Sequence, residues 1–107
     1  MEQNKIQEMQ FFQENLNAIL MQKRAFQMEL NETISSLGEV EKSSKDIYKI
    51  VGELMIKVPK EKTVDELKNK EKIIEMRLKK LEEQEEKIGS EVKKLREELI
   101  KSSKPKK

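Results

Sequence analysis

Four carboxylates crowd one short stretch of this sequence, at Glu82, Glu83, Glu85 and Glu86. Paired carboxylates can act as general acid and base when burial or a charged neighbour tunes their proton affinity. Here lysines stand three or four residues away on the same expected helix, where they form exposed ion pairs with the carboxylates. The pattern therefore predicts a solvated helix face, and we expect the protein not to be an enzyme.

Other residues that often carry chemistry are missing. The chain has no Cys and no His, which removes thiolate chemistry, disulfide bonds and the residue most often used for zinc ligation and proton transfer. Its three glycines, Gly38, Gly52 and Gly89, stand far apart, so no glycine-rich loop can cradle a phosphate. We therefore expect neither a cofactor nor a metal site.

The charge pattern argues against nucleic-acid and membrane partners. Charged residues make up 41% of the chain, yet its net charge is only +2, with both signs interspersed rather than gathered in a basic patch. The lysine-rich end lacks aromatic residues for base stacking, and it either keeps this end in solution or docks on an acidic protein surface. The longest helical apolar run, residues 18–21, is too short for a membrane span. We expect a cytoplasmic protein; a nucleic-acid-binding coiled coil is the least favoured alternative.

A heptad repeat runs through the first part of the chain. With Met9 at position a, eight of the ten a and d positions up to residue 40 are apolar. Leu20 and Ile34 widen this stripe at position e. The period predicts an amphipathic helix over residues 3–41, which the polar residues 43–46 bring to an end.

The next stretch has the pattern of a β-hairpin. Apolar residues fill both alternating faces of residues 47–58, and Gly52-Glu53 at its centre suits a type II′ turn. Pro59 ends the second arm because it has no amide hydrogen to donate. Two strands alone cannot form a protected sheet, and two apolar faces indicate burial on both sides. The predicted subunit interface is made of Ile47, Tyr48, Ile50, Val51, Gly52, Leu54, Met55, Ile56 and Val58.

A second heptad repeat follows the hairpin. With Val64 at position a, nine of the eleven a and d positions up to Leu99 are apolar. Thr63 and Glu66 fit a capping box at the start of a helix, so a helix is predicted over residues 64–101. The basic, proline-containing tail, residues 102–107, is expected to be disordered.

The order of these elements predicts the fold. Two helices of nearly equal length around a short hairpin favour a mostly α fold, an antiparallel two-helix coiled coil joined by one β-hairpin, in a single domain over residues 1–107. This pairing brings the polar seam residues Lys23 and Glu85 within about one turn of each other, where an ion pair can fix the register. The alternative is that both side chains extend into water.

The hairpin and its surroundings resemble a known family. The order of helix, short β segment and helix, with DIYKIVGELMIK (residues 46–57) at its centre, is similar to the β-type subunit of archaeal prefoldin. The likeness continues through residues 60–62, 66–68, 77–78 and 81–85. The discriminating part is the Tyr-Lys-x-Val-Gly segment between two helices, and a single hairpin fits the β type because the α type carries two.

The resemblance implies an ATP-independent chaperone. Such subunits form a hexamer of two α and four β chains, in which the hairpins build a β-barrel platform and the coiled coils project from it. The coil ends hold unfolded clients and deliver them to a group II chaperonin. The implied partners are therefore a prefoldin α-type subunit, further copies of this chain, unfolded proteins and a group II chaperonin. The pair Gly89-Ser90 departs from a regular coil and weakens the last helical turns.

The helix ends are the predicted client-binding surface. Most of their apolar residues belong to the heptad seam, but Phe11 and Ile100 do not, and exposed apolar patches mark interaction sites. The helix-end residues are Ile6, Met9, Phe11, Phe12, Val92, Leu95, Leu99 and Ile100. The alternative is that the seam residues pack only against each other and that the two others are isolated exposed side chains. The protein would then be a structural coiled-coil adaptor that scaffolds a complex without binding clients.

Overall fold

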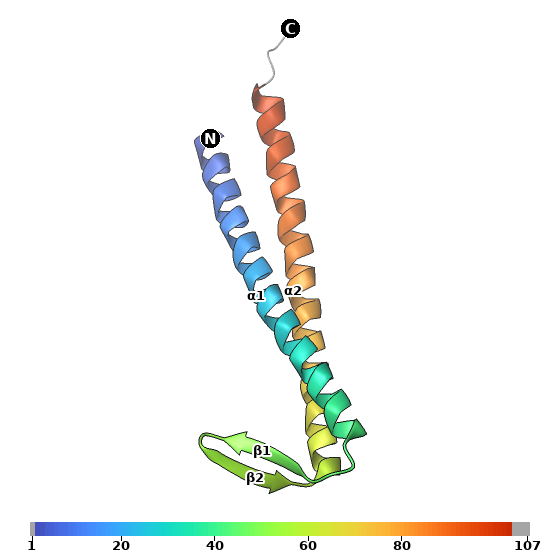
Figure 1. Ribbon diagram of the computed structural model, residues 1–107. Coiled ribbons are helices and arrows are strands. Elements are labelled where there is room, and N and C mark those ends of the chain that lie inside the picture. The colour runs from blue at the N-terminus through green and yellow to red at the C-terminus, as the bar shows by residue number, and fades with distance from the viewer. Residues whose placement is uncertain (1, 104–107) are drawn as a thin grey trace. The chain divides into compact units, whose positions relative to one another are not determined.

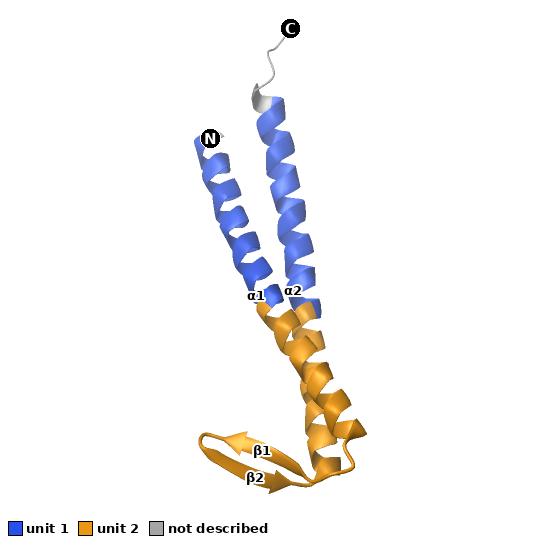
Figure 2. Cartoon of the chain, viewed as in Figure 1, with its two compact units in different colours: residues 1–24, 79–107 blue, residues 25–78 orange. Residues whose placement is uncertain are grey.

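The computed structural model describes residues 2–103, which form two long helices and one β-hairpin (Figure 1). The chain runs through α1 (Glu2–Lys42), β1 (Ile47–Val51), β2 (Leu54–Val58) and α2 (Lys60–Ser103). The described residues divide into two compact units (Figure 2). Residues 2–24 and 79–103 form the helix-end unit, and Ala25–Leu78 form the hairpin unit. The predicted mostly α fold with a single hairpin is confirmed.

The core of the hairpin unit consists of seam residues from both helices. Leu30, Ile74 and Leu78 form a buried cluster, against which Phe26 packs, and Ile74 is the most enclosed with 2% of its surface exposed. The guanidinium carbon of Arg77 lies 5.7 Å from the centroid of the Phe26 ring, close enough for a cation–π contact. The two helix segments of this unit therefore pack antiparallel through their a and d positions.

The same seam orders the helix-end unit. Ile19 of α1 and Leu81, Val92 and Leu95 of α2 are buried. In both units together, all a and d positions from residues 9 to 40 and from 64 to 99 are buried or half-buried, which confirms both heptad assignments. The widening of the stripe at position e is wrong, because Leu20 and Ile34 are exposed. A seam between only two helices covers a and d and leaves e at its margin.

The polar seam residues of the helix-end unit form the predicted ion pair. The Nζ atom of Lys23 donates a hydrogen bond to Oε1 of Glu85 over 3.0 Å. A second ion pair, between Lys5 and Glu98, spans 3.3 Å near the helix ends. The side chains of Lys23 and Glu85 are only 25% and 36% exposed, so each depends on the other for the hydrogen bonds that it loses to water. This pair therefore favours one register of α1 on α2.

The predicted capping box at Thr63 and Glu66 is wrong. The backbone N–H of Thr63 donates to the carbonyl oxygen of Pro59 over 3.1 Å, and the Thr63 hydroxyl donates to the same oxygen over 2.9 Å. Thr63 therefore lies inside the first turn of α2, which begins at Lys60. Pro59 stands directly before the helix, where its lack of an N–H leaves no hydrogen bond of the helix unmade.

Lys60 also connects the start of α2 to the end of α1. Its ammonium group donates to the carbonyl oxygens of Glu41 over 3.1 Å and of Ser43 over 2.8 Å. The last carbonyls of a helix have no partner within the helix and attract a cation. This contact holds the end of α1 close to the start of α2, at the base of the hairpin. No local sequence pattern predicts it.

The hairpin has the register expected for a two-residue loop. β1 and β2 pair antiparallel, with Val51 opposite Leu54 at the turn and Ile47 opposite Val58 at the base. Gly52 has a φ of +62°, as the first loop position of a type II′ turn requires.

α2 continues to Ser103. The predicted disordered tail is therefore wrong for residues 102 and 103, and its remaining residues, 104–107, lie outside the described part of the chain. Within the described part, no helix has an apolar stretch that could cross a membrane. The single-domain assignment stays a prediction.

Candidate functional site

The hairpin carries a dense group of exposed apolar side chains. Ile50 is 72% exposed and Met55, which lies opposite it, is 69% exposed. Ile47 and Val58 at the base are half-buried. The remaining apolar side chains of the predicted interface are exposed as well: Tyr48, Val51, Leu54 and Ile56. A group of this kind in a short segment is characteristic of a surface that another chain covers.

The pairing register divides the hairpin side chains between two faces. Residues directly opposite each other share a face, and successive residues alternate. The Tyr48 face consists of Tyr48, Ile50, Met55 and Lys57, and the Lys49 face consists of Ile47, Lys49, Val51, Leu54, Ile56 and Val58. Lys57 forms an ion pair with Asp46 over 3.3 Å. Each face is therefore mostly apolar, as the predicted burial on both sides requires.

Both edges of the hairpin offer backbone groups to a further strand. In a two-residue hairpin the pair next to the loop exchanges hydrogen bonds, so every second pair directs its N–H and C=O groups outward. The register makes these outward pairs Ile50 with Met55 and Tyr48 with Lys57. Open edges pair readily with strands of other chains. The hairpin can thus be extended into a larger sheet on either side.

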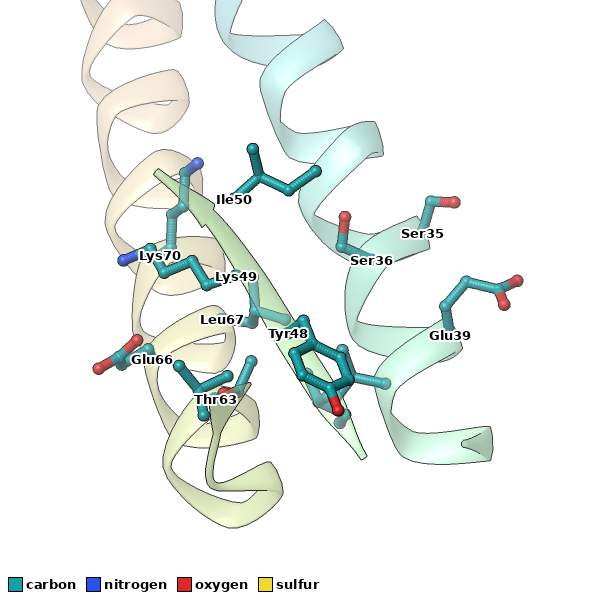
Figure 3. A pocket seen from close by; sticks show the side chains of 13 residues that line it. Ser35, Ser36, Glu39, Tyr48, Lys49, Ile50, Thr63, Glu66, Leu67 and Lys70 are labelled. Atoms are coloured by element: carbon teal, nitrogen blue, oxygen red, sulfur yellow. The ribbon is translucent and has the colours of Figure 1, made fainter. Parts of the chain in front are cut away.

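A groove of about 650 Å³ separates β1 from the helices within the hairpin unit (Figure 3). Four successive residues of β1, from Ile47 to Ile50, line one side. The other side combines hydroxyl, charged and apolar side chains of α1 and α2: Ser35, Ser36, Glu39, Val40, Thr63, Glu66, Leu67 and Lys70. Lys70 is engaged with Glu29 at 3.6 Å. The β1 edge therefore faces a space with a mixed polar and apolar lining.

The predicted client-binding residues differ in exposure. Ile6, Phe11 and Ile100 are exposed, with Phe11 at 59%, whereas Met9, Phe12 and Leu99 are half-buried. The rings of Phe11 and Phe12 lie 6.1 Å apart at an angle of 56°, a tilted contact that orients both rings. The helix ends therefore expose apolar surface beside the seam.

Val92 and Leu95, by contrast, are buried in the seam of the helix-end unit. They can touch another molecule only if the two helix segments separate. Heptad positions also divide the exposed residues: Ile6 (e) and Ile100 (b) belong to one flank of the coil, and Phe11 (c) belongs to the other. The exposed apolar residues at the helix ends therefore lie on two opposite flanks of the coil, Ile6 with Ile100 and Phe11 alone. The sequence alone suggests a single patch.

The four neighbouring carboxylates, Glu82, Glu83, Glu85 and Glu86, are either exposed to solvent or engaged in an ion pair. Glu82, Glu83 and Glu86 are exposed, and Glu85 is occupied by Lys23. In the described part of the chain, no three acidic side chains are grouped as a metal ion requires. This agrees with the expected solvated face.

Some exposed apolar residues escaped the sequence analysis. Met21, Met28, Ile73 and Met76 are half or more exposed on the helices, outside the seam and outside both predicted surfaces. Their heptad positions could have predicted this exposure, because the three methionines are at position f and Ile73 is at position c, outside the a and d seam. Isolated side chains of this kind are common on protein surfaces.

Comparison with known proteins gives one consistent result. A family model described as "Prefoldin subunit" matches residues 3–105. The prefoldin β subunit of Pyrococcus furiosus is 38% identical over an alignment that covers 92% of this chain and 86% of the relative. The prefoldin β subunit of Methanosarcina acetivorans is 36% identical over 97% of this chain and 91% of the relative.

Solved structures agree with the sequence matches. The crystal structure of the prefoldin β subunit from Thermococcus strain KS-1 superimposes with a TM-score of 0.91 and 34% identity, over 98% of this chain and 94% of that one. The β2 subunit from the same strain gives a TM-score of 0.70 with 19% identity, over 80% of this chain and 94% of that one, which supports the fold alone.

Proposed function

This chain belongs to the prefoldin subunit family, and from that premise we propose which of its surfaces performs each task of a prefoldin. Prefoldins are molecular chaperones that work without nucleotide: they capture unfolded proteins and deliver them to a group II chaperonin, and this chain is a subunit of that kind. The observation that carries the assignment of surfaces is the density of exposed apolar side chains in the hairpin, from Tyr48 to Ile56, together with the exposed Ile6, Phe11 and Ile100 at the helix ends.

The hairpin is the assembly surface. Its two apolar faces and two open edges are unfavourable in a free monomer, because exposed edges invite non-specific pairing. Strands of neighbouring subunits can cover the faces and complete the edges, and closing them into a barrel removes the edges altogether. The interface then consists of the predicted residues from Ile47 to Val58. We assign to the complete particle two α-type subunits and four copies of this chain.

The helix ends are the client-binding surface. Ile6, Phe11 and Ile100 offer apolar contact without any rearrangement, and the half-buried Met9 and Phe12 add a flexible thioether and an aromatic ring. Val92, Leu95 and Leu99 contribute when the helix segments part. Each coil binds weakly, and several coils on one particle bind an unfolded chain by avidity. The protein has no enzyme activity of its own and acts in the cytoplasm, where its clients pass to the chaperonin.

Client holding can be measured by light scattering. A denatured protein is diluted into buffer with the assembled complex, and aggregation should slow in proportion to the amount of complex. The test variant combines Ile6→Ser, Phe11→Ser and Ile100→Ser, and it should assemble normally but lose most of this protection. Met21→Ser is the control, because Met21 is 70% exposed but is not one of the residues assigned to client binding.

The outcomes separate a chaperone from a structural adaptor. Aggregation that proceeds unchanged in excess unmodified complex would favour a scaffold that never binds clients. Equal loss of protection in the test variant and in Met21→Ser would show that client contact is spread along the coil, and would overturn the helix-end assignment.

A further inference from the structure

Of the two lysines in the strands of the hairpin, Lys49 has neither a role in the assignments above nor an ion-pair partner among the described residues. Lys49 occupies the centre of the Lys49 face, opposite Ile56, with Val51 and Leu54 on one side of it and Ile47 and Val58 on the other. It is the only charged residue on that face. Every other position there is apolar, so the face resembles an interface core with a single cation at its centre.

Lys49 also has no ion-pair partner among the residues that the structure describes. Among residues 2–103, the ion pairs of lysines involve Lys5, Lys23, Lys57 and Lys70 but not Lys49. The other hairpin lysine, Lys57, is balanced by Asp46. Figure 3 shows the Lys49 side chain extending across the groove towards α2. Lys49 is therefore exposed and forms no ion pair with the described residues of its own chain.

Assembly removes water from around the Lys49 ammonium group. When a partner strand covers the Lys49 face, the apolar neighbours leave water and Lys49 is desolvated with them. A buried ammonium is costly unless a carboxylate and hydrogen-bond acceptors replace the lost water. An unpaired charge at the centre of an interface discriminates strongly between partners, because only a complementary surface can bury it.

We propose that Lys49 selects the neighbouring subunit, and that the strand covering the Lys49 face carries an Asp or Glu whose carboxylate binds the Lys49 ammonium. This inference rests on the assembly role proposed for the hairpin. It assigns to the partner a chemical feature, one carboxylate placed opposite Lys49, that an apolar interface alone would not require. Subunits without that carboxylate are excluded because they would bury Lys49 unpaired.

The groove holds two carboxylates of the same chain that could compete for Lys49. Glu66 of α2 lines it together with Lys49, as do Glu39 of α1 and Lys70, which is already paired with Glu29. No ion pair joins Lys49 to Glu66 or Glu39 among the described residues. A small movement on assembly could nevertheless bring Glu66 to Lys49, so the experiment must separate an acceptor in the same chain from one in the partner.

In the test, the unmodified chain and its variants are each mixed with the prefoldin α-type subunit of the same organism, and the stabilities of the resulting complexes are compared. Dissociation of the complex on dilution is followed by mass photometry or sedimentation velocity for Lys49→Met, Lys49→Gln, Glu66→Gln and the unmodified chain. Lys57→Met is the matched control, because it removes the hairpin lysine whose partner lies in its own chain. Circular dichroism checks that each variant keeps its helices, as exposed positions should.

Lys49→Met and Lys49→Gln should weaken assembly by about 30-fold or more, since each leaves a buried partner carboxylate without its cation. Lys57→Met and Glu66→Gln should stay within about threefold of the unmodified chain. Changing each Asp and Glu of the partner hairpins to its amide then identifies the carboxylate. That change should weaken assembly with the unmodified chain and have no further effect with Lys49→Met.

Three results would overturn this proposal alone, and a fourth would overturn the assembly role with it. Lys49→Met that assembles as tightly as the unmodified chain would mean that Lys49 merely extends into water. A loss in Glu66→Gln as large as in Lys49→Met would place the acceptor in the same chain. An equal loss in Lys57→Met would indicate a general effect of hairpin charge. Failure of the unmodified chain to assemble at all would overturn the assembly role of the hairpin, and the inference with it.

Discussion

The exposed pair Ile50 and Met55 gives the assembly role of the hairpin a measurable energy. Complete burial of a side chain of this size contributes about 1.5–3 kcal/mol. With 72% of Ile50 and 69% of Met55 exposed in the single chain, most of that contribution is available only to a partner, about 2–4 kcal/mol for the pair. Thr at both positions keeps the β propensity of the strands and removes most of the apolar area.

The double variant Ile50→Thr/Met55→Thr should therefore weaken each hairpin contact by about 2–3 kcal/mol, or about 30- to 140-fold in the association constant. Sedimentation velocity over a dilution series measures this change, and circular dichroism should show unaltered helix content. Met21→Gln, an equally exposed change on α1, should leave assembly within about threefold of the unmodified chain. Undiminished assembly of the double variant would show that Ile50 and Met55 do not contribute to the contact between subunits. Loss of the helices would place these two residues in the core of the chain itself.

Three further changes test the packing of the helices. Ile74→Ala should lower the free energy of unfolding by about 2–4 kcal/mol in urea melts, because the cluster around this enclosed residue cannot close the cavity; a loss below about 1 kcal/mol would show a loosely packed seam. Lys23→Leu should lower the melting temperature because it leaves Glu85 unpaired in the seam, whereas Lys23→Leu with Glu85→Leu should restore or exceed it; equal effects of the two variants would deny the pairing. Thr63→Ala should cost less than about 0.5 kcal/mol, whereas a loss of about 1 kcal/mol or more would mean that Thr63 acts as a helix cap after all.

Periodicity made much of this fold predictable. The heptad positions depend only on the repeat of apolar residues, and the structure buries or half-buries each of them from Met9 to Val40 and from Val64 to Leu99. The hairpin could also be predicted from the sequence, because Gly52 can adopt a positive φ at the first loop position and Pro59 ends the ladder of hydrogen bonds. The pairing of Lys23 with Glu85 followed from the antiparallel order once both seams were assigned.

The misplaced features depend on contacts that the local sequence does not contain. The start of α2 at Lys60 is favoured by hydrogen bonds from its ammonium group to the end of α1, a contact between residues far apart in the chain. Val92 and Leu95 are apolar, as residues of a binding surface often are, but they are buried because the opposite helix segment covers them. Lys49 was passed over because its significance appears only when the register shows that its neighbours on the same face are all apolar.

Site-specific photo-crosslinking tests most directly whether the helix ends, rather than the hairpin or the middle of the coil, hold the client. A photoreactive amino acid replaces Phe11, Met28 or Tyr48 in turn, and each assembled complex is irradiated with a denatured, labelled protein. We expect client crosslinks from position 11, crosslinks to neighbouring subunits from position 48, and few of either from position 28. Client crosslinks that are as abundant from position 28 or 48 as from position 11 would contradict the assignment of client binding to the helix ends.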